Sequence, residues 1–406
     1  MSSTQNAVSN PSSLLLPVAQ ASPQQGIRRP FADKALRASA VFWYVVVLAG
    51  QLIFAFATAS FFGLTAARGE LQRWGRVLTH GIIAGDRMGN TVLAIHLISA
   101  VFIILSGAIQ LIPQVRRRAP AFHRWNGRVY IVTAFTVSVA GVYLIWARGT
   151  VGGVVAHVGQ SVDAALIMIF AILAFRYAMA RDFRTHRRWA LRLYMVVSAS
   201  LFIRAAGIAV LIPASGSLFI VPLLSFAQYL VPLAVLELYL RAQERGGAKA
   251  RMAMAGVLFV LTLGLGAGIA VATATLFQPR IKAAFDTRTS IGDVLAATIA
   301  TSGIDAAERQ YHALKAAPPA SYNFDEAELN GLGYQLIAAK KIDEAIRVFQ
   351  LNTEAYPKSG NVWDSLAEGY MDAGNKPLAI AYYQKSLEVN PKNTNAVVML
   401  KKMGAQ

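Results

Sequence analysis

The sequence contains no cysteine among its 406 residues. Disulfide bonds, iron–sulfur clusters, thiolate zinc sites and covalently attached c-type haem are therefore excluded. Charged residues are also scarce, at 15% where a soluble chain carries about 25%, while hydrophobic residues make up 55%. The sequence has no P-loop, no Gly-x-Ser-x-Gly elbow and no His-Glu-x-x-His motif. Little charge and long apolar runs together predict an integral membrane protein.

The net charge of +18 is unevenly distributed along the chain. Residues 1–279 carry 25 basic and 7 acidic side chains, whereas residues 280–406 carry 14 of each. The basic excess thus lies between the apolar runs, where it is typical of membrane topology rather than of a DNA-binding surface. We expect membrane lipid as a partner and no nucleic acid.

Seven apolar runs are long enough to span a bilayer as helices, which takes about 20 residues. They cover residues 41–63, 91–113, 129–147, 153–179, 190–212, 217–240 and 254–276. Residues 1–36, rich in Ser, Gln, Pro and Ala, predict a disordered cytoplasmic tail. The expected fold class is all-α, with a seven-span bundle over 37–279, a linker over 280–300 and a soluble domain over 301–406.

Basic residues gather in the loops before the third, fifth and seventh spans. These are Arg116, Arg117, Arg118 and Arg124; Arg181, Arg184, Arg187 and Arg188; and Arg241, Arg245, Lys249 and Arg251. The loop at 148–152 has one basic residue and the loop at 213–216 has no charge. The positive-inside rule therefore predicts a cytoplasmic N-terminus and an extracytoplasmic C-terminal domain. The loop at 64–90 disagrees, because it carries four arginines on the expected outer side.

Two segments of the C-terminal domain match at one constant offset. The matched pairs are Leu332 and Leu366, Gly333 and Ala367, Ala345 and Ala379, Phe349 and Tyr383, and Pro357 and Pro391. The offset equals the tetratricopeptide period of about 34 residues, which predicts an α-solenoid of helical hairpins. An earlier, degenerate unit is out of register by four residues and is expected to cap the array. Its residues are Ala307, Tyr311, Leu314 and Pro319.

The segment from Tyr322 to Asn393 also resembles a C-terminal tetratricopeptide module of bacterial secreted hydrolases. The resemblance implies a domain that binds a protein partner or packs on its own membrane domain. By repeat register, eight residues should face the groove: Ala327, Asn330, Tyr334, Ile337, Asn361, Asp364, Glu368 and Met371. They lack the Lys/Arg pattern that grips a C-terminal carboxylate, so a clamp for chaperone tails is not expected. An array that only stabilises the membrane domain is the alternative.

Four of the six histidines fall one to a span near the starts of spans two to five: His96, His123, His157 and His186. Because successive spans run in opposite directions, His96 and His157 should lie at similar depth near one membrane face, and His123 and His186 near the other. Two haem irons, each with two axial imidazoles, need this layout in a four-helix bundle. It also resembles the plan of transmembrane cytochrome b561, so b-type haem is the cofactor hypothesis.

Two other interpretations of these histidines stay open. His123 and His186 stand beside arginines at the ends of spans and could be interfacial anchors. His96 and His157 could bind a metal ion with a third ligand. Asp163, six residues after His157, lies on another face of its helix, so no metal site is assigned.

Three further polar residues lie inside the spans: Gln110, Asp163 and Arg204. Asp163 and Arg204 fall at comparable depths on antiparallel spans, which predicts a buried ion pair, because either charge alone in hydrocarbon would be unfavourable. A role in handling protons or substrate is the alternative. Gln110 lies near the helical stripe of His96, and Arg204 lies on that of His186. A polar line through spans two and five is expected.

The third and fifth spans begin alike, which suggests two related hairpins. Trp, Arg and Tyr recur with identical spacing: Trp125, Arg128 and Tyr130, then Trp189, Arg192 and Tyr194. The first copy contains His123-Arg124 and Gly127-Arg128-x-Tyr130. With the upstream His96 and Gln110, it resembles a bacterial membrane-protein family known as domain of unknown function 2306. The resemblance covers about residues 40–240 and implies a multi-pass bacterial inner-membrane protein, with no activity attached.

Two functional classes follow. In the first, the protein is a scaffold, sensor or transporter whose repeats recruit a protein partner outside the cytoplasm. In the second, spans two to five hold two b-type haems and carry electrons across the membrane. His96 and His157 would then ligate the outer haem, and His123 and His186 the inner one.

Overall fold

The computed structural model describes residues 31–405 except 79–80, 84, 212–219 and 317–319. Most of the tail expected over 1–36 lies outside the described residues, as do Pro319, His80, and the points where the fifth expected span ends and the sixth begins. The first helix already begins at Phe31, so the last residues of the expected tail are helical.

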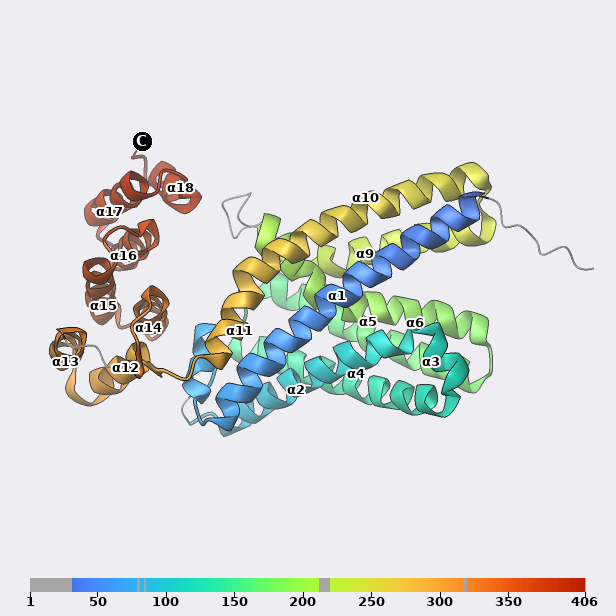
Figure 1. Ribbon diagram of the computed structural model, residues 1–406, viewed down its shortest axis with the longest axis horizontal. Helices are drawn as coiled ribbons and strands as arrows, with labels where there is room; N and C mark the ends of the chain where they lie inside the picture. The colour runs from blue at the N-terminus through green and yellow to red at the C-terminus, as the bar shows by residue number, and fades with distance from the viewer. Residues whose placement is uncertain (1–30, 79–80, 84, 212–219, 317–319, 406) are drawn as a thin grey trace, which may run out of the picture.

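Among the described residues, seven helices are long and apolar enough to cross a membrane, which agrees with the seven expected spans (Figure 1). They are α1 (Phe31–Ala67), α2 (Arg87–Gln110), α4 (Pro120–Arg148), α5 (Gly153–Met179), the run Phe183–Gly207, α9 (Val221–Arg245) and the run Ala248–Phe285. The fifth run comprises α6 (Phe183–Val197), α7 (Ala199–Phe202) and the start of a π-helical stretch, η2 (Ile203–Leu211). The seventh comprises α10 (Ala248–Ala272), η4 (Thr273–Phe277) and α11 (Gln278–Phe285).

Five of the seven spans start earlier than the apolar runs indicated. α4 begins at Pro120 and α6 at Phe183, so arginines that were expected in loops lie in first helical turns instead. Local capping explains both starts: a proline opens α4, and the Asp182 side chain accepts a hydrogen bond from the Thr185 N–H at the start of α6. Two short helices, η1 (Leu71–Arg76) and α3 (Pro113–Arg118), lie between spans.

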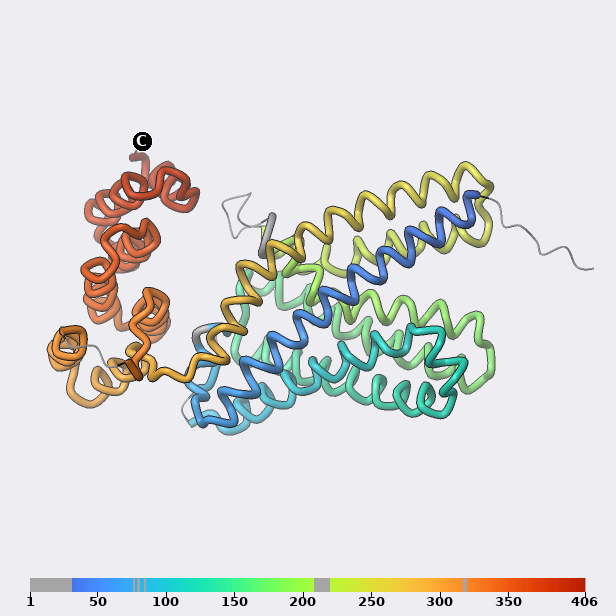
Figure 2. The backbone as a smooth tube through the Cα atoms, viewed as in Figure 1, coloured from blue at the N-terminus to red at the C-terminus, as the bar shows by residue number. Residues whose placement is uncertain are grey.

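Successive spans run in opposite directions, which gives the bundle two distinct ends (Figure 2). The N-terminal end holds the start of α1, α3 and the loops at 180–182 and 246–247. The C-terminal end holds η1, the loop at 149–152 and the end of α11, and the helices after α11 continue from it.

Spans two to five form a ring of four helices. α2 packs against α4, α4 against α5, α5 against α6, and α6 touches α2 again. Within this ring α2 and α5 face each other across the centre, as do α4 and α6. α1 pairs with α10 alongside the ring, and α9 packs against α5 and α6.

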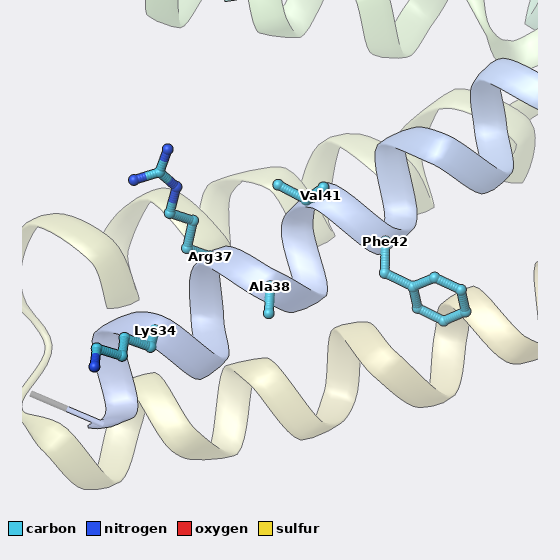
Figure 3. Close-up of a pocket in the computed structure, with 5 residues that line it drawn as sticks. All are labelled: Lys34, Arg37, Ala38, Val41 and Phe42. Atoms are coloured by element: carbon cyan, nitrogen blue, oxygen red, sulfur yellow. The ribbon is translucent and has the colours of Figure 1, made fainter.

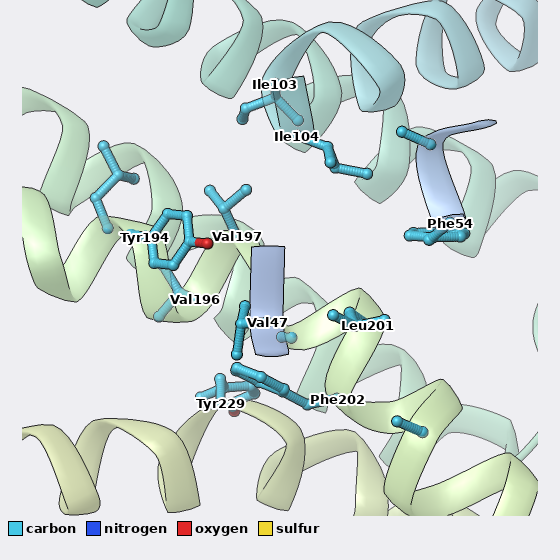
Figure 4. Packing of buried hydrophobic residues seen from close by; sticks show 14 of the residues in the cluster. Val47, Phe54, Ile103, Ile104, Tyr194, Val196, Val197, Leu201, Phe202 and Tyr229 are labelled. Atoms are coloured by element: carbon cyan, nitrogen blue, oxygen red, sulfur yellow. The ribbon is translucent and has the colours of Figure 1, made fainter. Parts of the chain in front are cut away.

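The main apolar core joins the ring to α1 and α9. It contains Val47 and Phe54 of α1, Val197 of α6, Phe202 of α7 and Tyr229 of α9 (Figure 4). Polar groups are also buried here: Gln51 of α1 donates to Ser198 Oγ at 2.8 Å and accepts from Tyr194 Oη at 2.8 Å. Both polar atoms at the end of the Gln51 amide are thereby engaged with the ring, which ties α1 to α6 in a fixed register.

The C-terminal residues fold into further helices with a regular spacing. They are α12 (Ile291–Ser302), α13 (Ile304–Ala316), α14 (Glu326–Ala338), α15 (Ile342–Ala355), α16 (Gly360–Asp372), α17 (Lys376–Val389) and α18 (Thr394–Lys402). α14, α16 and α18 begin at equal intervals, and the interval from α15 to α17 is the same. α13 begins four residues earlier than this interval would place it, which is the offset noted for the degenerate unit.

The matched small and aromatic positions lie in the core of these helices. Phe349 and Tyr383 are fully buried, as are Ala345 and Ala379. A side chain on Gly333 would collide with the Phe349 ring, so glycine there allows α14 and α15 to approach. The spacing of small and large residues thus sets the distance between paired helices.

Residues 280–300, expected to be a linker, are mostly structured. They contain the end of α11, a two-residue strand β1 (Thr289–Ser290) parallel to β2 (Tyr322–Asn323), and most of α12. Ile291 and Leu295 of α12 are fully buried in the core of the C-terminal helices. Apolar residues at helical spacing in this stretch therefore belong to that domain.

Candidate functional site

The candidate site is the ring of α2, α4, α5 and α6, which carries the four singled-out histidines. His96 of α2 packs on Gly141 of α4, and its Nδ1–H donates to the Val137 carbonyl at 3.1 Å. His186 of α6 makes the equivalent bond to the next helix of the ring, from Nδ1–H to the Ala174 carbonyl at 2.8 Å. In both residues the bond at Nδ1 leaves Nε2 available for another partner.

His157 of α5 is engaged differently. Its Nε2 accepts a hydrogen bond of 3.1 Å from the Thr150 N–H, and its ring packs edge-on against Trp146 with centroids 5.5 Å apart. Since Trp146 lies nine residues beyond Val137 on α4, His157 and His96 are offset by about 14 Å along the bundle. The similar depth expected for these two residues does not hold. The start of α2, four residues before the predicted start of its span, accounts for about 6 Å of the offset.

His123 and His186 lie near the N-terminal end of the ring. Each is the fourth residue of its helix, and the two imidazoles are within electrostatic range of each other. His123 Nδ1 is buried without a hydrogen-bond partner among the described residues. No cluster of three His, Asp or Glu side chains suited to a metal ion occurs in the described part of the chain.

The motif from His123 to Tyr130 packs α4 against α2. Gln110 Nε2 donates to the His123 carbonyl at 2.8 Å, and Asn126 Nδ2 donates to the Ser106 carbonyl at 2.9 Å. Gly127 lies against Gln110, and the buried Tyr130 ring lies against Gly107. Gln110, Gly127 and Tyr130 therefore join the two helices, while Arg124 and Arg128 are exposed.

The similarity between the starts of the third and fifth spans is also seen in the structure. The Arg128 guanidinium lies over Trp125 at 5.0 Å, and that of Arg192 lies over Trp189 at 4.6 Å. Arg192 additionally pairs with Glu237 of α9 at 2.7 Å. Both Trp–Arg pairs lie toward the N-terminal end of the bundle, where amphipathic side chains favour a membrane interface.

Asp163 and Arg204 do not form the expected ion pair. Asp163 lies within electrostatic range of Tyr229 on α9, and its Oδ1 is buried without a hydrogen-bond partner among the described residues. Arg204 donates to the Ser200 carbonyl at 2.6 Å and lies over the Phe54 ring at 4.7 Å. The prediction was wrong because α5 also packs on α9, and because π-helical winding from Ile203 changes the face that Arg204 presents.

Polar contacts that the sequence analysis missed close the C-terminal end of the bundle. Arg148 of α4 binds Asp86 at 2.7 Å, the Gly81 carbonyl at 2.8 Å and Asn90 Oδ1 at 2.7 Å. These bonds hold the pKa of the Asp86 carboxyl below its usual value. In the sequence Arg148 is a single charge at the end of an apolar run, and its partners are 58 to 67 residues away, so no local pattern identifies them.

Two cavities open at the N-terminal end of the bundle. One, of about 620 Å³, runs along α1 beside α10 and is lined by Lys34, Arg37, Ala38, Val41 and Phe42 (Figure 3). The other, of about 210 Å³, lies between the start of α6 and the end of α9 and contains three arginines. Both are outside the histidine ring.

The C-terminal helices present a connected polar face across α14, α16 and α18. Tyr334 Oη donates to Glu368 at 2.6 Å, and Asn395 donates to both Glu368 and Asp364. Burial raises the pKa of both carboxyls above their usual values. The expected groove residues Tyr334, Asp364 and Glu368 thus lie together, joined by Asn395, which the sequence register did not include.

Comparison with known proteins finds a similarity that includes the histidine ring. No curated protein matches the chain, and no solved structure matches it either. Residues 93–240 match a family model described as predicted membrane protein (DUF2306). The match covers most of α2, all of α4 to α7 and most of α9, but not α1, so it is shorter than the expected resemblance over 40–240. The histidine ring, together with most of α9, is therefore the part of this chain that is similar to the DUF2306 family of membrane proteins.

Proposed function

We propose that the chain is a multi-pass inner-membrane protein that presents a tetratricopeptide surface to a protein partner outside the cytoplasm. The observation that carries this proposal is the start of α14, α16 and α18 at equal intervals. Buried small and aromatic residues recur at the same interval, as the packing of paired helices in such repeats requires.

The distribution of charge supports the orientation. The N-terminal end of the bundle carries α3 with three arginines, the arginines at the start of α6 and those flanking the α9–α10 loop. At the other end, Arg68 and Arg73 donate to the carbonyls of Ala284 and Ala283, the last residues of α11 before Phe285. A cation at a helix C-terminus stabilises that helix. The arginines of the loop at 64–90 are thus partly explained by packing.

The polar face of α14, α16 and α18 is the surface that we assign to the partner. Tyr334 is 39% exposed and bridges two helices, so it offers both an aromatic face and a fixed hydroxyl. The partly exposed carboxyl of Glu368, with the largely buried Asp364 beside it, makes the face acidic. A partner segment with basic and amide side chains suits this chemistry.

Site-specific photo-crosslinking in cells tests the assignment. A photoreactive amino acid at exposed Ala327, in the groove register of α14, should yield a discrete adduct. The same group at Lys385, on α17, should not. The adduct should disappear in Glu368→Lys, which reverses a charge on the polar face. Equal adducts from both positions, or an adduct that survives Glu368→Lys in folded protein, would contradict a partner at this face.

A second candidate function is transmembrane electron transfer through b-type haem. The observation that favours it is the pair of bonds from His96 and His186 Nδ1–H to backbone carbonyls of the adjacent helix. Such bonds orient imidazoles that ligate a metal through Nε2. Bound haem would supply one-electron transfer.

The fit of the two expected haem sites differs. His123 and His186, on facing helices of the ring and within electrostatic range, suit one haem. His96 and His157 fit poorly, because they are offset along the bundle and because Thr150 occupies His157 Nε2.

An optical spectrum of the purified protein, oxidised and then reduced, separates the two functions. Sharp reduced α and β bands at one or two haems per chain would support electron transfer. Protein that stays colourless when expressed with ample haem would reject it. If haem is bound, His186→Ala should remove it and His157→Ala should have the smaller effect.

A further inference from the structure

The smaller cavity at the N-terminal end of the bundle is strongly basic. Its walls carry Arg184, Arg187 and Arg188 from the first turns of α6 and Glu244 from the last turn of α9. Only Arg188 approaches the glutamate, with 3.7 Å between Nη1 and Oε2. Among the described residues no carboxylate forms an ion pair with Arg184 or Arg187. Asp182, just before α6, lies within electrostatic range of Arg184. Three arginines thus meet two carboxylates, and the cavity keeps a net positive charge.

The Arg188 guanidinium also has an unused donor. Its Nε is buried and makes no hydrogen bond among the described residues. A buried donor without a partner is unfavourable by itself, and an acceptor in the cavity would relieve this. Arginine groups spaced along one helix face suit a tetrahedral oxyanion, because each can present two parallel N–H donors.

The position of the cavity indicates where the oxyanion comes from. Trp189 follows Arg188 directly, and the Trp125–Arg128 pair lies toward the same end. Leu191 and Leu240 line the side of the cavity toward the bundle interior. A ligand here would have an anionic head among arginines and an apolar part beside leucines, which is the chemistry of a phospholipid at the membrane interface.

Positive charge from α1 adds to the same region. Arg37, from the cavity of Figure 3, and Arg187 both lie within electrostatic range of the Tyr239 hydroxyl on α9. The volume of about 210 Å³ is several times the roughly 30 Å³ that one water occupies in the liquid, which leaves room for a phosphate group.

We propose that the cavity formed by Arg184, Arg187 and Arg188 binds the phosphate of an anionic phospholipid. Sequence patterns assigned these arginines only to membrane topology. The cavity gives them a ligand-binding role that is independent of both the repeat surface and the histidine ring.

Native mass spectrometry of the full-length protein, released from nanodiscs with graded delipidation, tests the proposal. In discs of phosphatidylglycerol and phosphatidylcholine, the wild type should retain phosphatidylglycerol selectively. The triple variant Arg184→Gln, Arg187→Gln, Arg188→Gln should lose about a hundredfold in apparent affinity, because it removes the charge-assisted hydrogen bonds from the cavity to the phosphate.

A matched control separates a site from general charge attraction. The variant Arg116→Gln, Arg117→Gln, Arg118→Gln removes three charges from α3 at the same end and should keep the lipid. The single variant Arg184→Gln, checked to be monodisperse, should lose part of the affinity for phosphatidylglycerol. It keeps the proposal testable if the triple variant misfolds. Equal loss in both triple variants would overturn the proposal. Displacement of the lipid by millimolar inorganic phosphate would also overturn it and identify a site for free phosphate.

Discussion

The carboxyl of Asp163 on α5 lies within electrostatic range of the Tyr229 hydroxyl on α9, and each residue has a buried oxygen without a hydrogen-bond partner among the described residues. Both side chains lie inside the spans. Neither completes a network like that of Gln51, whose amide is bonded through both its nitrogen and its oxygen. A polar group left unbonded in an apolar interior destabilises the fold by about 1–3 kcal/mol.

Replacing this carboxyl should therefore stabilise the protein. We expect Asp163→Leu to raise the midpoint of thermal unfolding in detergent, by an amount equivalent to about 1–3 kcal/mol, because leucine has no polar atom to satisfy. A carboxyl retained at such a position would then point to a role in function. A fall in the midpoint would show that Asp163 has a stabilising partner.

Asp86 provides the matched comparison. Its carboxylate binds Arg148, whose side chain is only 5% exposed. Asp86→Leu should lower the same midpoint, because it leaves a largely buried guanidinium without its carboxylate. The midpoint of thermal unfolding is therefore expected to rise for Asp163→Leu and to fall for Asp86→Leu.

The contact between Gly107 and Tyr130 should tolerate no added atom. A Cβ on Gly107 would lie 2.8 Å from Tyr130 Cε2, inside the packed seam of α2 and α4. Gly107→Ala should thus destabilise the protein by about 1–3 kcal/mol through overpacking. Gly256→Ala in α10 is the control, since nothing lies within 4 Å of its Cβ position and alanine favours a helix. Chemical denaturation of both variants in the same detergent compares their free energies of unfolding. Equal changes in the two variants would contradict tight packing between α2 and α4.

The sequence predicted the features that repeat or extend over many residues. Seven apolar runs identified the spans, since length and hydropathy alone decide whether a helix can cross a bilayer. The spacing of the C-terminal helices was indicated by residues that recur in the next unit, such as Leu332, Gly333 and Phe349. Each of these positions has the same packing role in both units.

Contacts between spans could not be predicted in the same way. Gln51 finds its partners Tyr194 and Ser198 at separations of 143 and 147 residues, and nothing near Gln51 in the sequence indicates them. Asp163 and Arg204 do lie on packed antiparallel spans, but their side chains face different neighbours. In an apolar helix the polar–apolar pattern is too weak to show which face meets which neighbour, so the facing partner depends on the whole bundle.

The absence of native cysteine allows a direct test of orientation. Lys358→Cys places one thiol in an exposed loop between α15 and α16, and Arg117→Cys places one on exposed α3. In intact spheroplasts a membrane-impermeant maleimide should label Lys358→Cys at once and Arg117→Cys only after lysis. The reverse pattern would place the C-terminal helices in the cytoplasm and exclude an extracytoplasmic partner.

The polar face of the C-terminal helices should respond to pH. Burial raises the pKa of Asp364 and Glu368 from the ordinary values of 3.8 and 4.5, although hydrogen bonds from Asn395 and Tyr334 act in the opposite direction. A carboxyl with a raised pKa in the folded state binds its proton more tightly there than when unfolded. Its contribution to stability is therefore complete below the unfolded-state pKa and is lost as the pH rises through the folded-state value.

Hydrogen exchange of the full-length protein, corrected for intrinsic rates, should accordingly show less protection of α16 and α18 as the pH rises from about 4 to about 8. Tyr334→Phe removes a hydrogen bond that lowers the pKa of Glu368, so the loss of protection should become larger. Glu388→Gln removes a carboxylate that pairs with Lys385 on the surface and should leave the profile unchanged. Protection that increases with pH in the wild type would mean that the two carboxylates are stabilised as anions, and the polar face would then have to be far more hydrated than its contacts indicate.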